Sequence, residues 1–264
     1  MSPTRIVVLG AGGRMGQEII DVGRREETIT IQGAIEAAQH PQVGKAVSPD
    51  LPNLAITDDL AAALEGADVL IDFTRPEATI PSLAAAARAG VAAVIGTTGM
   101  SAADRKAIAH YAEDIPIVYS PNMSVGINVM LWLLRIAVDT LGDDYDVEIL
   151  EAHHRHKVDA PSGTALRLAE VVCDAKGWNM NDTLRFARQG HTGPRQDNAI
   201  GVQVIRGGDV AGDHTAFFLG EGERLEITHR ASSRRVFARG ALRAASWVAG
   251  RAPGLYGMAE VLGL

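Results

Sequence analysis

The segment "VVLGAGGRMG" (Val7–Gly16) decides the fold, because a short apolar run passes directly into a glycine-rich turn and then into a helix-like segment. Its glycines fit Gly10-x-Gly12 or Gly10-x-x-Gly13-x-x-Gly16, in the strand–turn–helix context of a dinucleotide fingerprint. Glycines allow a sharp turn and a close approach to a pyrophosphate, whose charge meets the free N–H groups of the helix start. The segment therefore predicts nucleotide binding.

An acidic residue strengthens this prediction. Glu36 follows the second apolar run, about 20 residues after Gly16, where a carboxylate accepts hydrogen bonds from the adenosine ribose. The alternative is a structural glycine turn with a solvated glutamate. Ala37 comes next, so no arginine stands there for a ribose 2′-phosphate, and the carboxylate would repel that phosphate. We predict that NADH serves at least as well as NADPH, with Arg14 as a possible phosphate contact.

The first half of the chain alternates apolar runs with helix-like segments. We expect strands at Ile6–Leu9, Ile29–Ile35, Val69–Phe73, Ala92–Ile95 and Ile115–Tyr119. Continuous apolar strands separated by helices are typical of a parallel sheet covered on both faces. The pattern predicts an α/β, doubly wound, Rossmann-like domain. Turn-rich segments follow all five runs, and because ligands bind at the carboxyl ends of such strands, these segments should share one crevice.

The second half changes character. "YDVEILEAHH" is strand-like, "GTALRLAEVVCDAKG" is helical, and residues 198–231 are rich in β-formers and turns. This pattern predicts an α+β domain with an open mixed or antiparallel sheet. We place the dinucleotide-binding domain at residues 1–124 and a substrate-binding and oligomerisation domain at 125–237. The helical region 238–264 is expected to pack back on the first domain.

Composition excludes several classes of protein. The 264 residues are 47% hydrophobic with a net charge of −7, which is globular and argues against nucleic acid as a partner. The single cysteine, Cys173, cannot form an internal disulfide, and the start lacks an export signal. The apolar segment Asn128–Leu141 carries Arg135 and Asp139 and is shorter than the roughly 20 residues of a bilayer span. We expect a buried or interface helix there, and no membrane partner.

The segment "EAHHRHKVDAPSGTAL" (Glu151–Leu166) carries the candidate chemistry. A metal site is one interpretation, but His153 and His154 are adjacent and point in different directions, which leaves His156 with at most one partner. We expect no metal. Acid–base chemistry fits better, because an imidazole titrates near neutrality and the ammonium of Lys157 can hold an anion or give a proton. A solvated cationic loop is the alternative.

Small polar residues follow at the expected start of a helix. "PSGT" (Pro161–Thr164) would leave backbone N–H groups pointing outward, which is a potential anion site. Ordinary helix capping by Asp159 or Ser162 is the other interpretation, and the two can coexist. The segment thus combines candidate proton donors with a candidate carboxylate site.

Together with "GAGGRMG", "DFTRPE", "IGTTG", "SVGINVM", "RQGHTGPR" and "GERLEITHRASSR", this segment resembles the dihydrodipicolinate reductase family from about Arg5 to the C-terminus. The resemblance implies NAD(P)H-dependent reduction of a cyclic dicarboxylate, 4-hydroxy-tetrahydrodipicolinate, to tetrahydrodipicolinate in the diaminopimelate route to lysine. It also implies a cytoplasmic homotetramer that assembles through the β-rich domain. Many relatives carry an arginine at the position of Ala37, so the resemblance leaves the cofactor preference open.

The resemblance also implies roles for residues. His153 would be the proton donor and acceptor, Lys157 a second proton donor, and His154 a substrate ligand. Ser162 and the backbone of Gly163 and Thr164 would hold a carboxylate. Arg234 would be a further partner, and Arg235 beside it is the alternative. The implied cofactor residues are Gly10, Ala11, Gly12, Gly13, Arg14, Met15, Glu36, Gly96, Thr97, Thr98, Ser120, Pro121, Asn122 and Met123.

Two alternatives stay open beside this function. One is another Rossmann-type dehydrogenase acting on a small acid or aldehyde. The other is a nucleotide-sensing protein without catalysis, since a fold does not determine a function. A sensor has no need for His153 and Lys157 beside an anion-binding helix start, which favours the enzyme.

Overall fold

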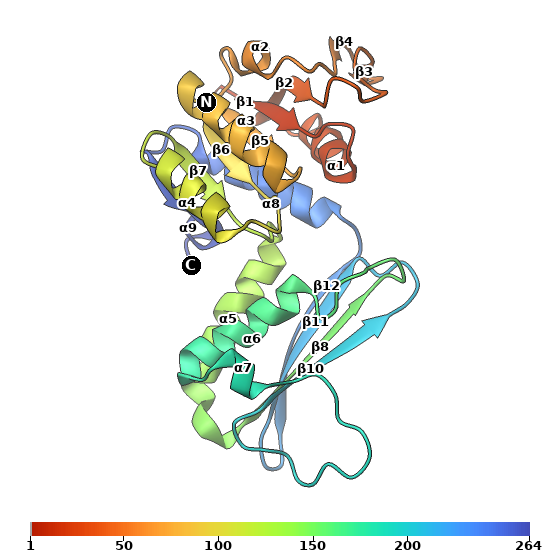
Figure 1. Ribbon diagram of the computed structural model, residues 1–264, viewed down its shortest axis with the longest axis vertical. Helices are drawn as coiled ribbons and strands as arrows, with labels where there is room; N and C mark the ends of the chain where they lie inside the picture. Colours follow the sequence, from red (N-terminus) through yellow and green to blue (C-terminus); the bar gives the residue numbers. More distant parts are fainter. Residues whose placement is uncertain (1) are drawn as a thin grey trace. The chain divides into compact units, whose positions relative to one another are not determined.

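The computed structural model describes residues 2–264, and its internal contacts divide them into two units (Figure 1). Unit 1 comprises the chain up to Val125 together with Arg234–Leu264, and unit 2 is Gly126–Ser233. The sequence predicts these changes after residues 124 and 237. The C-terminal region thus contributes to the same compact unit as the glycine-rich segment.

Unit 1 is built on a parallel sheet, as predicted for a Rossmann-like domain. Within residues 2–264 it has six strands in the order β13-β7-β6-β5-β1-β2, and every neighbouring pair runs parallel. The strands are β1 (Thr4–Leu9), β2 (Ile29–Ile35), β5 (Val69–Asp72), β6 (Ala92–Ile95), β7 (Pro116–Tyr119) and β13 (Gly254–Tyr256). Five of them lie at the five apolar runs of the sequence.

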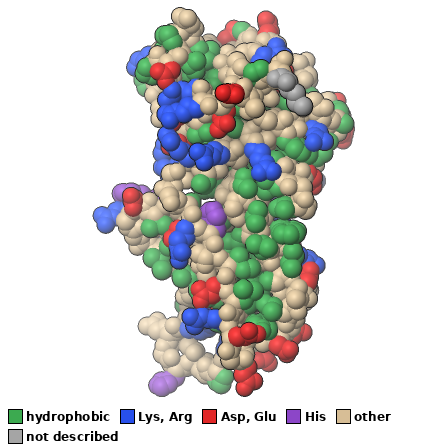
Figure 2. Space-filling model, turned by 180° about the vertical axis from the view of Figure 1, so that it is seen from behind, with side chains coloured by type: hydrophobic (Ala, Val, Ile, Leu, Met, Phe, Trp, Pro, Cys, Tyr) green, Lys and Arg blue, Asp and Glu red, His purple; other side chains and the backbone are tan. Residues whose placement is uncertain are grey.

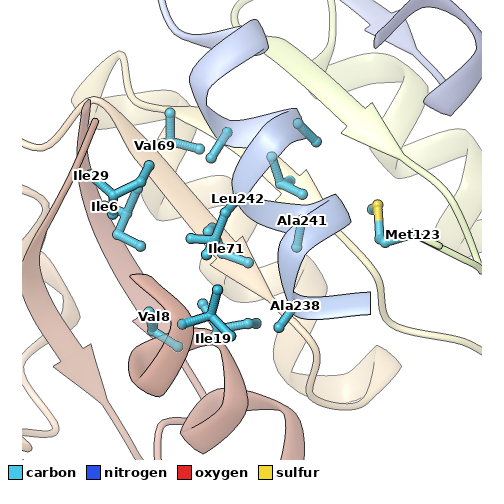
Figure 3. Packing of buried hydrophobic residues seen from close by; sticks show 14 of the residues in the cluster. Ile6, Val8, Ile19, Ile29, Val69, Ile71, Met123, Ala238, Ala241 and Leu242 are labelled. Carbon is cyan, nitrogen blue, oxygen red and sulfur yellow. The ribbon is translucent and has the colours of Figure 1, made fainter. Parts of the chain in front are cut away.

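Both faces of this sheet are buried. Ile6 and Val8 of β1 belong to one hydrophobic cluster, while Val7 and Leu9 belong to another, because successive side chains of a strand point to opposite faces. Figure 3 shows α8 against the first face, with Ala238, Ala241 and Leu242 directed toward residues of β1 and β5. The helices of unit 1 are α1 (Arg14–Gly23), α2 (Leu60–Leu64), α3 (Pro76–Ala89), α4 (Ala102–Tyr111), α8 (Arg235–Val248) and α9 (Met258–Leu262).

Three elements of unit 1 were missed by the sequence analysis. A small antiparallel pair, β3 (Ala46–Ser48) and β4 (Leu51–Ala55), follows β2. β13 adds an edge strand beside β7, within the region 238–264 that the sequence predicts to be helical. All three are five residues long or shorter, so none carries enough hydrophobic periodicity to be recognised in the sequence.

Unit 2 has a mixed sheet, as predicted. Its order is β12-β11-β8-β10-β9; β8 and β10 run parallel, whereas β11 runs antiparallel to both β8 and β12. The strands are β8 (Asp146–His153), β9 (Leu184–Arg185), β10 (Ile200–Arg206), β11 (Gly212–Leu219) and β12 (Arg224–Ala231). The helices are α5 (Val125–Leu141), which begins at the last residue of unit 1, the 3-10 helix η1 (Gly142–Asp144), α6 (Gly163–Lys176) and α7 (Met180–Thr183). Figure 1 shows α5 and α6 lying on one face of this sheet, where their apolar side chains form the core of unit 2.

The helix α5 is strongly apolar. The stretch Val125–Asp144 has the length and composition of a membrane span, but Leu134 and Val138 pack in the core of unit 2. Arg135 forms an ion pair with Asp139 one turn later. Large side chains of this helix are also exposed, among them Trp132 at 44%. Figure 2 shows hydrophobic side chains gathered on the face of this unit that is turned to the viewer.

Candidate active site

The glycine loop of unit 1 makes the tight turn that its sequence predicts. The N–H groups of Gly10 and Ala11 both donate to the carbonyl oxygen of Ile35, at 2.8 and 3.0 Å. Gly10 has a φ of +74°, a left-handed conformation that favours glycine. At Gly16 a Cβ would overlap the carbonyl oxygen of Gly10. These glycines let the backbone fold closely against the start of α1, as a pyrophosphate site requires.

Glu36 stands beside this loop. Its Oε2 accepts a hydrogen bond from the N–H of Gly12 at 3.0 Å, and its Oε1 lies 3.3 Å from the N–H of Ala37. A carboxylate at this place, just after β2, fits the role of a ribose ligand. The tight glycine turn and the carboxylate of Glu36 together suit a dinucleotide.

Arg14 and Met15 open α1. Arg14 lines a hollow of about 310 Å³ together with Glu18, Arg234 and other side chains of unit 1. Burial and the nearby charge of Arg14 lower the pKa of the Arg234 guanidinium, and Glu18 counteracts them. Arg234 lies immediately before α8 and belongs to unit 1, whereas the histidine segment belongs to unit 2. Its expected contact with the substrate stays a prediction.

The other two predicted cofactor segments follow β6 and β7. At Gly96 a Cβ would overlap the ring of Phe73, so a larger residue there would require that ring to move. The hydroxyl of Thr97 lies 3.1 Å from Asp72 Oδ1 and is buried, while Thr98 is exposed. Because the hydroxyl of Thr97 is engaged inside the fold, its backbone is what this loop can offer a ligand.

The segment after β7 is similarly held from within. Ser120 Oγ donates to the carbonyl oxygen of Asn122 at 2.9 Å, and Asn122 Oδ1 accepts from the N–H of Ser124 at 2.9 Å. Pro121 is exposed. Met123 is 1% exposed and packs in the core of unit 1, as Figure 3 shows. Here too, backbone groups are better placed than the methionine side chain to meet a cofactor.

In unit 2 the last residue of β8, His153, is held by a buried glutamate. Its Nδ1 lies 2.6 Å from Oε2 of Glu151, which has no exposed surface, while the His153 side chain is 11% exposed. Arg206 donates to both oxygens of the same carboxylate, at 2.6 and 2.8 Å. The N–H of Ser162 donates to Oε1 at 2.9 Å.

A second histidine packs against the first. The rings of His153 and His214 meet edge to face, with centroids 5.1 Å apart. Burial lowers the pKa of His214 to about 3, and the charges of His153, His229 and Lys157 act in the same direction while Glu151 opposes them. His214 is therefore neutral, and its Nε2 lies 3.2 Å from Oγ of Ser162. Because it is uncharged near pH 7, His214 can support the ring of His153 without placing a second positive charge beside it.

The loop after β8 carries the remaining cations. The N–H of Lys157 donates to the carbonyl oxygen of His154 at 3.1 Å, and the N–H of His154 donates to Val210 at 2.8 Å. The ammonium of Lys157 lies 2.9 Å from Asp159 Oδ1, with the lysine side chain 20% exposed. The rings of His154 and His156 are 6.3 Å apart and tilted. Lys157 is thus a partly shielded charge close to the surface.

The helix start is arranged as predicted. Ser162 rather than Asp159 caps α6, its Oγ accepting from the N–H of Ala165 at 3.2 Å. Gly163 and Thr164 are the first two residues of the helix. Within the described chain, a Cβ added at Gly163 would have no atom within 4 Å, so the surface there is open. Capping by Ser162 leaves this place available for a carboxylate.

Three residues of this site were missed by sequence analysis. Glu151 could have been found, because alternation along a strand puts residues 151 and 153 on the same face. Arg206 and His214 could not, since they depend on register: Arg206 pairs with His153 across β10 and β8, and His214 with Glu151 across β11 and β8. Across residues 2–264, no group of three or more His, Cys, Asp or Glu side chains is arranged to hold a metal ion.

Comparisons with known proteins cover both units. Residues 4–123 match the family model for the N-terminus of dihydrodipicolinate reductase, and residues 126–262 match the model for its C-terminus. The chain is 52% identical to the 4-hydroxy-tetrahydrodipicolinate reductase of Anaeromyxobacter dehalogenans, over 99% of this chain and 98% of that relative. It is 49% identical to the enzyme of the same name from Thiobacillus denitrificans, over 98% of each chain.

Solved structures share the fold. The dipicolinate-bound dihydrodipicolinate reductase from Paenisporosarcina sp. TG-14 aligns with a TM-score of 0.76 at 24% identity, covering 98% of both chains. An amine dehydrogenase from Mycobacterium smegmatis aligns with a TM-score of 0.60 at 14% identity, covering 96% of this chain and 94% of that one. The second likeness shows that this two-unit fold also serves other substrates.

Proposed function

This chain belongs to the dihydrodipicolinate reductase family, and from that premise we propose that it reduces 4-hydroxy-tetrahydrodipicolinate to tetrahydrodipicolinate with NADH or NADPH. The product is an intermediate of the diaminopimelate route to lysine. The observation that carries the proposal is His153, held by a buried carboxylate and followed by the open helix start at Gly163. An acid and a carboxylate site on one segment suit the reduction of a dicarboxylate.

The reaction needs a hydride, a proton and the loss of water. The reduced nicotinamide supplies the hydride and both electrons when it is bound. The hydroxyl group and a proton from the adjacent ring carbon leave as water, and the electrons of that C–H bond form the new double bond of a conjugated ring. The hydride then adds to one ring carbon, and a proton adds to the position where the electron pair is left. His153 gives that proton, Lys157 is the second proton donor, and His154 binds the substrate. The backbone of Gly163 and Thr164, beside the cap Ser162, holds a carboxylate.

The test is to follow NADH oxidation by absorbance after the substrate is formed in situ from pyruvate and aspartate semialdehyde. Substitution of His153 or Lys157 by alanine should lower kcat strongly and leave the affinity for NADH nearly unchanged, because both belong to unit 2 while the glycine loop belongs to unit 1. An equal loss of cofactor affinity would contradict the assignment. Folded protein that oxidises no NADH would overturn the function.

For the cofactor, we propose that NADH is used at least as well as NADPH. Glu36 contacts the glycine loop through Gly12, and the next residue is Ala37, which has no charge for a 2′-phosphate. The hollow beside Arg14 and Arg234 offers positive charge, so a preference for NADPH would have to come from there. A kcat/KM for NADPH more than tenfold above that for NADH would contradict this proposal.

We also propose a cytoplasmic homotetramer assembled through unit 2. Exposed apolar side chains support it, such as Ile205 of β10 and Leu225 of β12, at 51% and 42% exposure. Large exposed apolar areas commonly mark protein interfaces. Light scattering should give four times the mass of the chain, and a monomer at micromolar concentration would contradict the proposal.

A further inference from the structure

We propose that Glu151 is a positioning residue for the reduction, which fixes with one carboxylate both the proton-donating ring of His153 and the start of α6. The inference rests on the function proposed above. It goes beyond that function, since it assigns a role to a residue outside the proposed substrate and cofactor ligands.

The carboxylate of Glu151 uses both of its oxygens. Oε2 contacts Nδ1 of His153 and Nη1 of Arg206, each at 2.6 Å. Oε1 accepts from the N–H of Ser162 at 2.9 Å and from Nη2 of Arg206 at 2.8 Å. One side chain of β8 thereby connects β10 with the residue that caps α6. A shift of this carboxylate would move the acid and the helix start together.

Glu151 remains charged although it is completely buried. Burial by itself would raise the pKa of its carboxyl group. The hydrogen bonds from Arg206, His153 and the N–H of Ser162 outweigh burial and hold that pKa below its ordinary value. A buried carboxylate is costly unless a partner compensates it, and the bidentate guanidinium of Arg206 does so here.

The charge of Glu151 determines which nitrogen of His153 gives the proton. An ionised carboxylate only accepts hydrogen bonds, so Nδ1 must carry hydrogen and donate it. Nε2 is then the atom that faces a reaction partner. A Cβ added at Gly212 would lie 3.1 Å from Nε2, so the absence of a side chain at Gly212 keeps space beside this atom. The edge-to-face contact with His214 supports the ring from β11.

Other charged and titratable groups surround this pair. Arg206 approaches from β10, neutral His214 from β11, and His229 of β12 acts on His214. Lys157 and Asp159, an ion pair, stand on the loop after β8. Of these groups, Glu151 alone holds a carboxylate oxygen against the ring of His153.

The substitution Glu151→Gln tests this role because it keeps the shape and removes the charge. We expect kcat to fall about 10- to 100-fold, less than the roughly 10²–10⁴-fold that a general acid itself contributes. The pH profile of kcat/KM should also change in the variant, because the amide removes the negative charge that contacts the proton donor. The Kd of NADH should not change. Glu151→Asp, which restores the charge on a shorter side chain, should recover part of both effects.

A matched control lies on the same strand. Glu148 accepts two hydrogen bonds from Arg188 at 2.8 Å and one from Arg195 at 3.1 Å, and no contact joins it to His153 within the described residues. Glu148→Gln should lower Tm without moving the pH profile of kcat/KM. If Glu151→Gln also lowers only Tm, the carboxylate has a structural role and the proposal is overturned.

A measurement on the wild-type protein covers the case in which Glu151→Gln does not fold. Nitrogen NMR of the labelled imidazoles should show that neutral His153 carries its hydrogen on Nδ1. Hydrogen on Nε2 would overturn the proposal. The NMR measurement does not require the enzyme to turn over. A wild-type protein that carries hydrogen on Nδ1 of His153 but oxidises no NADH would refute the proposed function and leave the contact with Glu151 in place.

Discussion

Acid should destabilise unit 2 through His214, and the substitution His214→Gln should reduce that sensitivity. His214 is 4% exposed, and burial, followed by the charge of His153, lowers its pKa from 6.5 to about 3. His229 and Lys157 add to this effect and Glu151 opposes it. In the unfolded chain the same imidazole takes up a proton below its ordinary pKa. The unfolded state therefore binds more protons than the folded state, and stability falls as the pH falls.

The size of the effect follows from the pKa difference. Above pH 6.5 neither the folded nor the unfolded state binds a proton at His214, so His214 does not make the free energy of unfolding depend on pH. Below it the free energy of unfolding declines by about 1.4 kcal/mol per pH unit, until the folded state also takes up the proton near pH 3. At about pH 5 the loss amounts to roughly 2 kcal/mol, a substantial part of the 5–15 kcal/mol that typically holds a domain together.

The assay is urea unfolding at about pH 7.5 and pH 5, at one protomer concentration because assembly affects apparent stability. Other groups also titrate in this range, so the informative quantity is the difference between the two proteins. Wild type should lose about 2 kcal/mol more than His214→Gln between the two pH values. An equal loss would show that His214 is not held neutral by its surroundings and would refute the reasoning.

Three further substitutions test the cofactor unit. Ala37→Arg should raise kcat/KM for NADPH relative to NADH by about tenfold, because a guanidinium beside the ribose offers a 2′-phosphate a partner worth roughly 1.4 kcal/mol; steady-state kinetics with both cofactors checks it. Gly16→Ala should abolish NADH binding in calorimetry, since the new Cβ overlaps the carbonyl oxygen of Gly10 and opens the turn. Ser101→Ala removes the capping box that Ser101 forms with Asp104 and should cost about 1 kcal/mol in urea unfolding.

The fold could be predicted where local pattern and tertiary role agree. The run Ile29–Ile35, which is apolar at residues 29, 31, 34 and 35, is β2 at the same residues. Short elements gave no such signal: β13 has three residues, and its pairing with β7 depends on the return of α8 to unit 1. A strand of that length is defined by the edge it completes and not by its own sequence.

In the active site, the sequence predicts those residues that are close to one another along the chain. The sequence leaves Asp159 and Ser162 as alternative caps for the helix, and Ser162 caps α6. The environment of His153 could not be predicted in the same way, because Arg206 reaches it only through the pairing of β10 with β8, 53 positions later in the chain. Strand register, and with it the contacts of the Glu151 carboxylate, depends on how the whole sheet assembles.

The two units place different demands on their residues, and this separates the effects of substitution. In unit 1 the loops after β1, β6 and β7 present mainly backbone groups, as the buried side chains of Thr97 and Met123 illustrate. Cofactor affinity should therefore respond to glycine and turn substitutions that move the backbone. In unit 2 the acid is held by the carboxylate of Glu151, which in turn accepts hydrogen bonds from the side chain of Arg206 and the N–H of Ser162. The value of kcat and its pH dependence should therefore respond to single changes of charge. A substitution that changes both the affinity for NADH and the pH profile of kcat/KM would have to act on both units. Each contact described here lies within a single unit, so we expect no substitution at these contacts to change both.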